Sequence, residues 1–175
     1  MRIIFLGGPG SGKSTVGSRL AEGLNWPWVS SGEILRQSKE PWVIEKLKTA
    51  QLFDDEMIAS LVLSRLHQTS NAILDGFPRT LKQAEIMMSR GEKIDVIAEM
   101  VVPIEEVQKR LFLRGRDQDT KEIIEERFRM YEQDKDEIVA FLVGNGAKLV
   151  KIDGVGTPDE AFQRTINELQ EAISR

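Results

Sequence analysis

A glycine-rich segment near the N-terminus carries the residues with the most specific chemistry. Residues 7–15 read GGPGSGKST and directly follow the apolar run Ile3–Leu6. The segment matches G-x-x-x-x-G-K-[ST], in which glycines let successive backbone N–H groups point at phosphate oxygens and the lysine adds a mobile positive charge. If Lys13 opens a helix over Ser14–Gly23, the positive end of that helix also faces the phosphates, and the Ser14 hydroxyl can ligate magnesium. We therefore predict nucleotide phosphate binding at Gly8, Pro9, Gly10, Ser11, Gly12, Lys13, Ser14 and Thr15.

A second motif, LDGFPRT at residues 74–80, follows another apolar run. An aspartate that ends a buried strand beside a phosphate-binding loop can organise magnesium through its water shell, so Asp75 is predicted to act on the metal through water. Gly76 permits a close backbone approach, and the planar fork of Arg79 suits a phosphate. Taken alone, Asp75 could be a turn cap and Arg79 a solvated loop charge. In combination with the glycine-rich segment, they indicate a second part of the same site.

Two further segments place arginines where they could meet a polyanion. In SSGEILR, residues 30–36, a serine cap leads into a short helix that carries Arg36. Taken alone, this segment could equally be an ordinary capped helix with a surface arginine. The second segment is a basic series later in the chain, which comprises Arg110, Arg114, Arg116 and Arg127. Salt bridges to neighbouring acidic residues explain part of this series.

These parts are sufficient for phosphoryl transfer, which demands alignment and charge neutralisation more than covalent help. A hydroxyl acceptor would need a general base, whereas a phosphate acceptor would not, because its oxygens are already ionised near neutral pH. The chain has no second histidine besides His67, and Asp75 is assigned to magnesium. The lack of an obvious base in the sequence favours a phosphate acceptor.

The composition limits the class of protein. A chain of 175 residues, 41% of them hydrophobic, can form one well-buried core, and we expect one main domain. The net charge of -4 does not favour nucleic-acid binding, and no apolar run approaches membrane-spanning length. Without cysteine and with one histidine, the chain is not expected to bind zinc, so a metal would need oxygen ligands, as magnesium does. The N-terminus shows a strand pattern and not a signal segment, and we expect a cytoplasmic location.

Short apolar runs alternate with longer amphipathic stretches, which is the pattern of a parallel sheet with helices on both faces. Asp54 or Asp55 and Thr80 are candidate helix N-caps. Because ligands bind beyond the carboxyl ends of parallel strands, the motifs that follow strands should meet at one edge of the sheet. The predicted strands are Arg2–Leu6, Trp28–Ser30, Ala72–Leu74, Val96–Val102 and Lys148–Ile152. The predicted helices, besides Ser14–Gly23, are Asp55–His67, Thr80–Arg90, Glu105–Leu113, Lys121–Leu142 and Pro158–Ile173.

The motifs GGPGSGKST, SSGEILR and LDGFPRTLKQAE, followed by the arginine series, occur in an order that resembles the adenylate kinases, a branch of the nucleoside monophosphate kinases. The resemblance covers nearly the whole chain. It implies an α/β protein with the three-layer α/β/α P-loop NTPase fold and a five-stranded parallel sheet, with residues 1–175 forming a single kinase core. It also implies a short monophosphate-binding excursion around residues 30–60 and a minimal lid around residues 114–120.

By this resemblance, the reaction is magnesium-dependent, reversible phosphoryl transfer from ATP to AMP, giving two ADP, carried out by a monomer. Thr80 and Gln83 stand where pyrimidine-specific members carry asparagines, so they favour AMP, and Arg110 would lie against the adenine of ATP. The implied catalytic residues are Lys13, Arg79, Arg114, Arg116 and Arg127. The implied AMP-binding residues are Ser30, Ser31, Gly32, Arg36, Phe53, Gly76, Arg79 and Gln83.

Two departures from the family pattern bear on specificity. Almost nothing is inserted between Arg114 and Arg127, which resembles the short-lid members without a zinc-binding lid. The interval from Arg36 to Leu52 is also short, and Pro41-Trp42 interrupts what is usually a longer helical excursion. A trimmed acceptor segment leaves open a kinase for another acceptor, such as CMP, UMP or a small metabolite. A nucleotide-gated regulatory ATPase is the other alternative.

Overall fold

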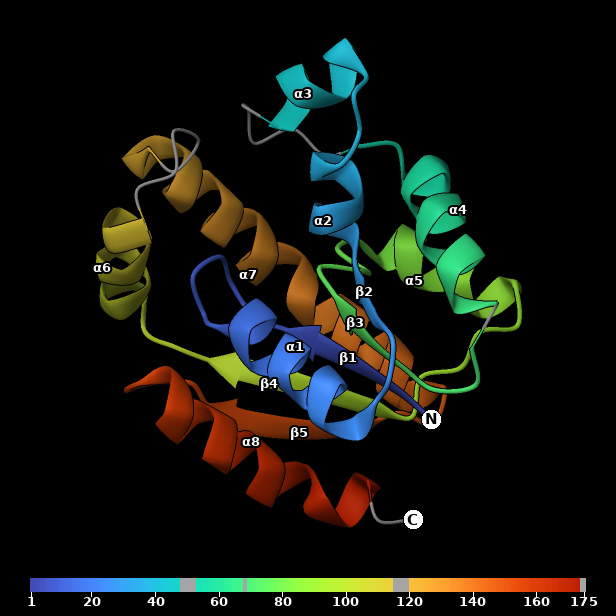
Figure 1. Ribbon diagram of the computed structural model, residues 1–175. Helices are drawn as coiled ribbons and strands as arrows, with labels where there is room; N and C mark the ends of the chain where they lie inside the picture. The colour runs from blue at the N-terminus through green and yellow to red at the C-terminus, as the bar shows by residue number, and fades with distance from the viewer. Residues whose placement is uncertain (48–52, 68, 115–119, 174–175) are drawn as a thin grey trace.

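The computed structural model describes residues 1–47, 53–67, 69–114 and 120–173, which form a parallel sheet between layers of helices (Figure 1). In this part of the chain, five strands pair in the order β2-β3-β1-β4-β5, and every pair is parallel. The predicted parallel sheet is therefore confirmed, with strand ends within one residue of those expected. The strands are β1 (Arg2–Leu6), β2 (Trp28–Ser30), β3 (Ala72–Asp75), β4 (Val96–Val101) and β5 (Lys148–Asp153).

The sequence patterns predict every described helix except α3, which begins at Pro41. Proline suits the first turn of a helix, where its missing N–H leaves no bond unmade, so the expected interruption is the start of a new short helix. Within the described ranges, no helix is both long and apolar enough to cross a membrane. The helices are α1 (Lys13–Leu24), α2 (Ser31–Arg36), α3 (Pro41–Leu47), α4 (Asp55–Leu66), α5 (Leu81–Ser89), α6 (Ile104–Arg114), α7 (Lys121–Gly144) and α8 (Pro158–Ile173).

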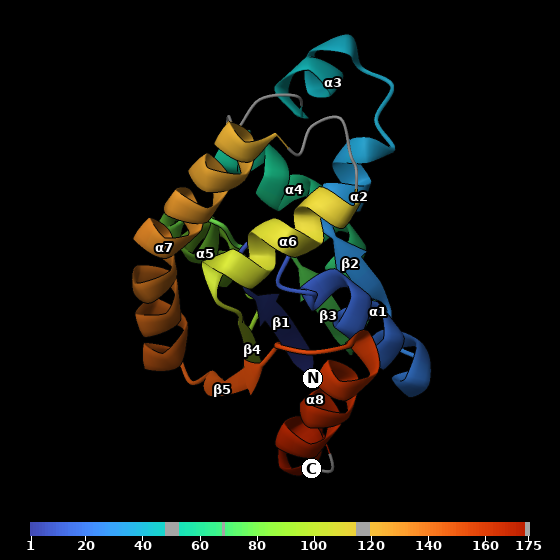
Figure 2. The same cartoon turned by 90° about the vertical axis from the view of Figure 1, so that its left-hand side faces the viewer.

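Different helices cover the two faces of the sheet (Figure 2). Successive strand residues point to opposite faces, so Ile3 and Phe5 of β1 lie on one side and Ile4 lies on the other. Ile3 and Phe5 pack into a core shared with α1 and α8, to which Val16 and Leu169 belong. Ile4 belongs to the core formed with α4, α5 and α7. The expected three-layer α/β/α arrangement is confirmed.

A smaller apolar cluster joins α6 to α7 beside the sheet. It contains Val107 and Leu111 of α6, Ile124 of α7 and Val102 after β4, and Phe128 packs against it. These two helices flank the predicted lid. Of the lid, only the backbone of residue 114 and residue 120 are described, and residues 115–119 lie outside the described ranges.

A polar side chain at the N-cap sets the start of three helices, α2, α4 and α5. The side chain of Ser30 caps α2, that of Asp54 caps α4 and that of Thr80 caps α5, each by accepting a backbone N–H bond. The sequence left Asp54 and Asp55 as alternatives, and the structure assigns the cap to Asp54. Asp55 is thereby free to place its carboxylate elsewhere.

Candidate active site

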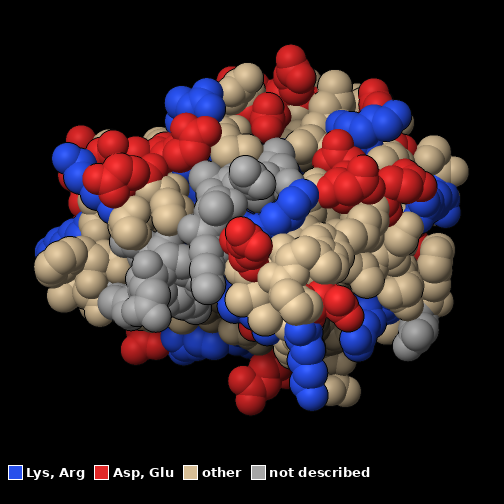
Figure 3. Space-filling view, turned by 90° about the horizontal axis from the view of Figure 1, so that it is seen from above, with Lys and Arg blue, Asp and Glu red and all other residues tan. Residues whose placement is uncertain are grey.

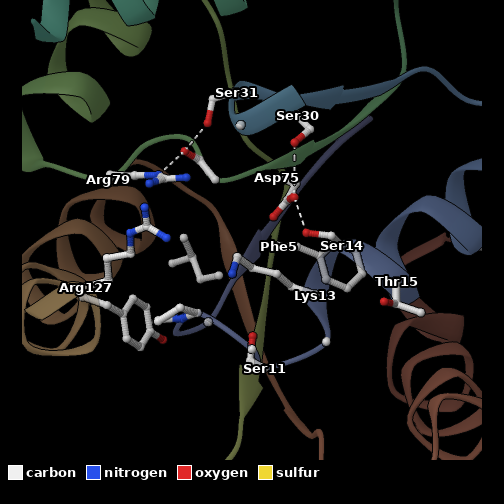
Figure 4. A pocket seen from close by; sticks show the side chains of 18 of the residues that line it. Phe5, Ser11, Lys13, Ser14, Thr15, Ser30, Ser31, Asp75, Arg79 and Arg127 are labelled. Carbon is white, nitrogen blue, oxygen red and sulfur yellow. Dashed lines mark hydrogen bonds between the residues drawn. The ribbon is translucent and has the colours of Figure 1, made fainter. Parts of the chain in front are cut away.

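A pocket of about 770 Å³ opens at the carboxyl edge of the sheet. It lies between the P-loop, which we define as residues 7–15, and residues of α2, α6, α7 and the loop that follows β3. Figure 4 shows labelled side chains from the P-loop, from the start of α2, from the loop after β3 and from α7 around this pocket. On the face seen from above, acidic and basic side chains are mixed among the residues drawn in colour, without one broad basic surface (Figure 3). Of the basic series that the sequence analysis singled out, Arg110 and Arg127 line the pocket.

Most predicted site residues line this one pocket, although they come from distant parts of the chain. Gly8 is not in the lining, but its carbonyl oxygen contacts Lys13. Arg114 ends α6 with its side chain outside the described part, and Arg116 lies outside the described residues altogether. The predicted residues that line the pocket are Pro9, Gly10, Ser11, Gly12, Lys13, Ser14, Thr15, Ser30, Ser31, Gly32, Arg36, Phe53, Asp75, Gly76, Arg79, Gln83, Arg110 and Arg127.

The P-loop wraps around the start of α1. Gly12 is the N-cap of that helix, with a left-handed φ of 90°, a conformation that glycine adopts without steric cost. Lys13, the first helical residue, donates from Nζ to the carbonyl oxygen of Gly8 over 3.1 Å. The hydroxyl of Ser11 is buried and has no hydrogen-bond partner in the structure. This arrangement presents backbone N–H groups, an ammonium and a helix N-terminus to an anion in the pocket.

A carboxylate stands next to the P-loop at the end of β3. Ser14 donates to Asp75 Oδ2 over 2.6 Å, and Ser30 donates to the same oxygen over 3.3 Å. Asp75 is only 4% exposed, and its other oxygen, Oδ1, is buried without a hydrogen-bond partner. A buried carboxylate oxygen without a partner is costly, because its desolvation is not compensated. The pair of Ser14 and Asp75 therefore fits a hydrated cation such as Mg²⁺, which needs one or two protein oxygens and keeps several waters.

No group of three or more potential acidic or histidine ligands occurs among the described residues. A fully protein-made metal cage is therefore not present there. Mg²⁺ does not require one, since it is commonly held by one carboxylate together with substrate phosphates and water. The donor set of Ser14 and Asp75 matches that mode of binding.

Arginine side chains form the opposite wall of the pocket from the P-loop (Figure 4). Arg79 Nε donates to the carbonyl oxygen of Gly76 over 2.8 Å, which orients the guanidinium. The pKa of Arg79 is lowered, chiefly because the surrounding protein desolvates its guanidinium. The side chain nevertheless stays accessible from the pocket. Asp75 raises this pKa, while Arg127 and Arg36 lower it. An arginine remains protonated under these conditions, so the repulsion among the three would be relieved by a bound anion.

Behind Arg79, the side chain of Gln83 is almost fully buried, with 2% exposure. Its Oε1 accepts a bond of 2.8 Å from the backbone N–H of Arg79, and its Nε2 donates to Asp55 Oδ1 over 2.9 Å. Thr80 Oγ1 donates to the same Asp55 oxygen over 3.0 Å. Gln83 thus lines the pocket with an amide whose two ends are both engaged by protein.

On the other side of the P-loop, Arg110 joins α6 to the loop after β5. Its Nη2 donates to the carbonyl oxygens of Gly154 and Gly156 over 2.9 and 3.1 Å, and its Nε pairs with Glu106 over 2.9 Å. These contacts hold the flat guanidinium in the lining of the pocket. A planar cation in such a position can pack against an aromatic base.

The sequence analysis missed residues of α7 that complete the wall around Arg127. Tyr131, Asp134 and Lys135 line the pocket, and they follow Arg127 at helical spacing, which was the available signal. Burial and, next, the carboxylate of Glu99 raise the pKa of Tyr131, whose hydroxyl donates to Glu99 over 3.5 Å. Tyr131 is therefore protonated and cannot act as a base near neutral pH.

The sequence analysis also missed two apolar side chains that pack closely against glycines of the P-loop. A Cβ at Gly8 would come within 2.9 Å of the ring of Phe128, and one at Gly10 within 2.8 Å of Leu111. Phe128 comes from α7 and Leu111 from α6. No local sequence signal marks such contacts, because they depend on how these helices pack beside the sheet.

The sequence of the chain was also compared with those of known proteins. A sequence model of the family described as adenylate kinase matches residues 5–146. The chain is 37% identical to an adenylate kinase of Mycobacteroides abscessus and 36% identical to one of Mycobacterium leprae, each over 97% of this chain and 99% of the relative. An adenylate kinase of Mycolicibacterium paratuberculosis is 37% identical over 95% of this chain and 97% of the relative. With its P-loop, its parallel sheet and its arginine-lined pocket, the chain belongs to the adenylate kinase family of nucleoside monophosphate kinases.

Proposed function

We propose that this protein catalyses reversible phosphoryl transfer from ATP to AMP, giving two ADP. The observation that carries the proposal is that one pocket is lined by two separate sets of groups whose chemistry suits phosphate. The P-loop with Lys13 supplies one set, and Arg79 with Arg36 supplies the other. An enzyme that only hydrolysed ATP would have no use for the second set.

On the donor side, backbone N–H groups of residues 8–15 cradle the phosphates of ATP, and Lys13 neutralises part of their charge. Arg110 lies beside the adenine of ATP. Arg114 and Arg116 belong to a short lid, around residues 114–120, that closes over the donor and adds positive charge during transfer. Closure excludes water, which would otherwise hydrolyse ATP.

On the acceptor side, an excursion around residues 30–60 binds the monophosphate together with the loop after β3. Arg36 and Arg79 bind the phosphate of AMP through charge-assisted hydrogen bonds. Phe53 and Gln83 meet the adenine, and both line the pocket. The remaining proposed AMP contacts are Ser30, Ser31, Gly32 and Gly76.

Magnesium is the proposed cofactor, bound with ATP, and the site is not proposed to bind zinc. Ser14 would ligate the ion directly, and Asp75 would hold it through water, which gives the unpartnered Oδ1 of Asp75 a function. When bound there, the ion would neutralise part of the negative charge on the donor phosphates.

The residues act mainly by positioning and by stabilising charge. A phosphate acceptor is already ionised near neutral pH, so no general base is needed. Arg79 and Arg36 align the acceptor oxygen with the donor phosphate, which lowers the entropic part of the barrier. Lys13 and Arg127 stabilise the negative charge that is spread over the transferred group.

Each chain contains both halves of the proposed site, and we propose that the protein acts as a monomer. The cytoplasm is the proposed location, because the proposed substrates are ATP and AMP. Sedimentation at enzymatic concentrations would report a species of 19.8 kDa if the first point holds. Fractionation of cells would test the second.

The decisive experiment supplies Mg-ATP with AMP, GMP, CMP, UMP or no acceptor and identifies the products by chromatography. Among these acceptors, we expect only AMP to give rapid formation of ADP from Mg-ATP. ADP supplied as the only nucleotide should be converted to equal amounts of ATP and AMP. This reverse reaction distinguishes an adenylate kinase from a kinase for another acceptor.

Two results would overturn the proposal. Preference for CMP, UMP or a different metabolite would keep the phosphoryl-transfer chemistry and replace the acceptor. ATP hydrolysis that does not depend on an acceptor would instead favour a regulatory ATPase.

A further inference from the structure

The amide of Gln83 is held in a single orientation by the chemistry of its partners. A backbone N–H, such as that of Arg79, can only donate, and a carboxylate, such as that of Asp55, can only accept. The bonds of 2.8 Å to Gln83 Oε1 and 2.9 Å from Gln83 Nε2 satisfy both requirements. If the amide were turned over, its NH₂ would face an N–H and its oxygen would face a carboxylate oxygen.

Asp55 makes this orientation costly to reverse. Its Oδ1 also accepts the Thr80 hydroxyl over 3.0 Å, so the carboxylate is itself fixed in place. Thr80 in turn caps α5 by accepting from the backbone N–H of Gln83 over 3.1 Å. The N-terminus of α4 and the N-terminus of α5 are thereby joined around one buried amide.

The engaged amide keeps capacity for a ligand. An amide oxygen has two lone pairs and an amide NH₂ has two hydrogens, of which the protein uses one each. One acceptor site and one donor site of Gln83 therefore remain, and the side chain lines the pocket. Adenine offers the complementary pair at its six-membered ring, with a donor at the 6-amino group and an acceptor at N1.

A 6-oxopurine offers the reverse pair. Guanine and hypoxanthine carry an acceptor at O6 and a donor at N1, so they would pair with Gln83 only if its amide were turned over. The bond to Asp55 opposes that turn, as does the N–H of Arg79. A buried polar group left with the wrong partner costs much more than a missing contact.

Resting on the proposed AMP-binding role of Gln83, we propose that Asp55 is a specificity-determining positioning residue, which fixes the Gln83 amide for 6-aminopurine monophosphates and against 6-oxopurine monophosphates. Asp55 acts through Gln83 and does not itself contact the base. The sequence analysis considered Asp55 only as a possible helix cap, a role that Asp54 fills.

The test is the variant Asp55→Asn, assayed with AMP and with inosine monophosphate as acceptors. These two acceptors share ribose and phosphate and differ only at the 6-position and N1. Asparagine keeps the size of the side chain, but its own amide can turn to donate to a reversed Gln83. We expect the ratio of kcat/KM for AMP to that for inosine monophosphate to fall by about tenfold or more.

The matched control is Asp54→Asn, the same substitution at the adjacent residue. Asp54 Oδ1 accepts from the backbone N–H of Met57, and asparagine caps helices as well as aspartate does. This variant should keep the wild-type ratio of AMP to inosine monophosphate. If it loses selectivity as far as Asp55→Asn does, the effect is one of charge near α4 and the proposal is overturned.

A further variant, Gln83→Ala, separates failure of the inference from failure of its premise. Loss of the AMP preference in Gln83→Ala, together with loss in Asp55→Asn, supports the proposal. Loss in Gln83→Ala alone shows that Gln83 reads the base without Asp55 and overturns it. An unchanged preference in Gln83→Ala also overturns the premise that Gln83 reads the base of AMP. A wild-type enzyme that is inactive with AMP overturns the proposed function itself.

The Asp55→Asn variant also tests for a merely structural role. An equal fall in kcat/KM for both acceptors would indicate such a role and would overturn the inference.

Discussion

The hydroxyl of Ser14 donates a hydrogen bond of 2.6 Å to Asp75 and so ties the start of α1 to the end of β3. The two residues are far apart in sequence, and the parallel pairing of β1 with β3 brings the P-loop and Asp75 to the same edge of the sheet. The proposed metal function of this pair leads to the first prediction.

The substitution Asp75→Asn should reduce turnover by about a hundredfold or more, because it removes the charge that would hold hydrated magnesium beside the donor phosphates. Asparagine can still accept the bonds from Ser14 and Ser30, so the fold should be preserved. Turnover measured against magnesium concentration should show a higher requirement for the ion. A chelator should abolish wild-type turnover, and added magnesium should restore it.

The control for this prediction is Asp95→Asn, at the opposite end of the sheet. Asp95 is exposed and accepts from the backbone N–H of Arg2 over 2.6 Å. The Asp95→Asn variant should therefore have the same magnesium requirement as the wild-type enzyme. A normal magnesium response in Asp75→Asn would contradict the assignment of Asp75.

Replacing Lys13 with alanine should lower kcat by about a hundredfold or more, since charge stabilisation of the transferred group is lost. The fold should remain, because Lys13 contacts the P-loop through its flexible end, at Gly8. Steady-state kinetics and a thermal melt monitored by circular dichroism would measure the two effects. Near-normal kcat would exclude the proposed role of Lys13.

Replacing Arg79 with alanine should raise KM for AMP much more than KM for ATP. Each charge-assisted hydrogen bond to the monophosphate is worth roughly 1.5–3 kcal/mol, which corresponds to a change of more than tenfold. Arg79→Lys should recover only part of the loss, because an ammonium keeps the charge but lacks the planar fork. Equal changes in KM for the two substrates would show that Arg79 does not belong to the acceptor side.

Two alanine substitutions in α1 test the packing of the layer beneath the site. A Cβ at Gly17 would come within 2.5 Å of the Trp28 ring, whereas one at Gly23 would meet nothing within 4 Å. We expect Gly17→Ala to destabilise the protein by about 1–2 kcal/mol, because overpacking outweighs the gain in helix propensity. Gly23→Ala should stabilise it by roughly 0.5–1 kcal/mol. Urea unfolding of both variants would measure the difference, and a stabilised Gly17→Ala would show that Trp28 moves aside without cost.

Elements that depend on nearby residues could be predicted from the sequence. The strand bounds of β1 and β2, the helix bounds of α8 and the cap at Thr80 agree with expectation. The P-loop could be recognised because its function depends on the conformations of consecutive glycines and on one helix start. Most of the predicted phosphate-binding residues lie together in one pocket, because every parallel strand ends at the same edge of the sheet.

Local patterns were less informative where one residue permits two structures. Pro41 was expected to interrupt a helix, and it begins α3. Proline both ends one helix and suits the first turn of the next, so sequence alone does not choose between these outcomes. The two aspartates at the start of α4, Asp54 and Asp55, posed the same problem, since either could cap the helix.

The P-loop motif, the parallel sheet and the inventory of charged groups that could meet two phosphates could all be predicted from patterns of nearby residues. The hydrogen bond between Gln83 and Asp55 and the packing of Phe128 against Gly8 became evident only in the folded chain. Such contacts between distant residues depend on how α4 lies against α5 and how α7 lies against the P-loop. Those arrangements arise from burial of whole helix faces, which no short pattern of residues encodes.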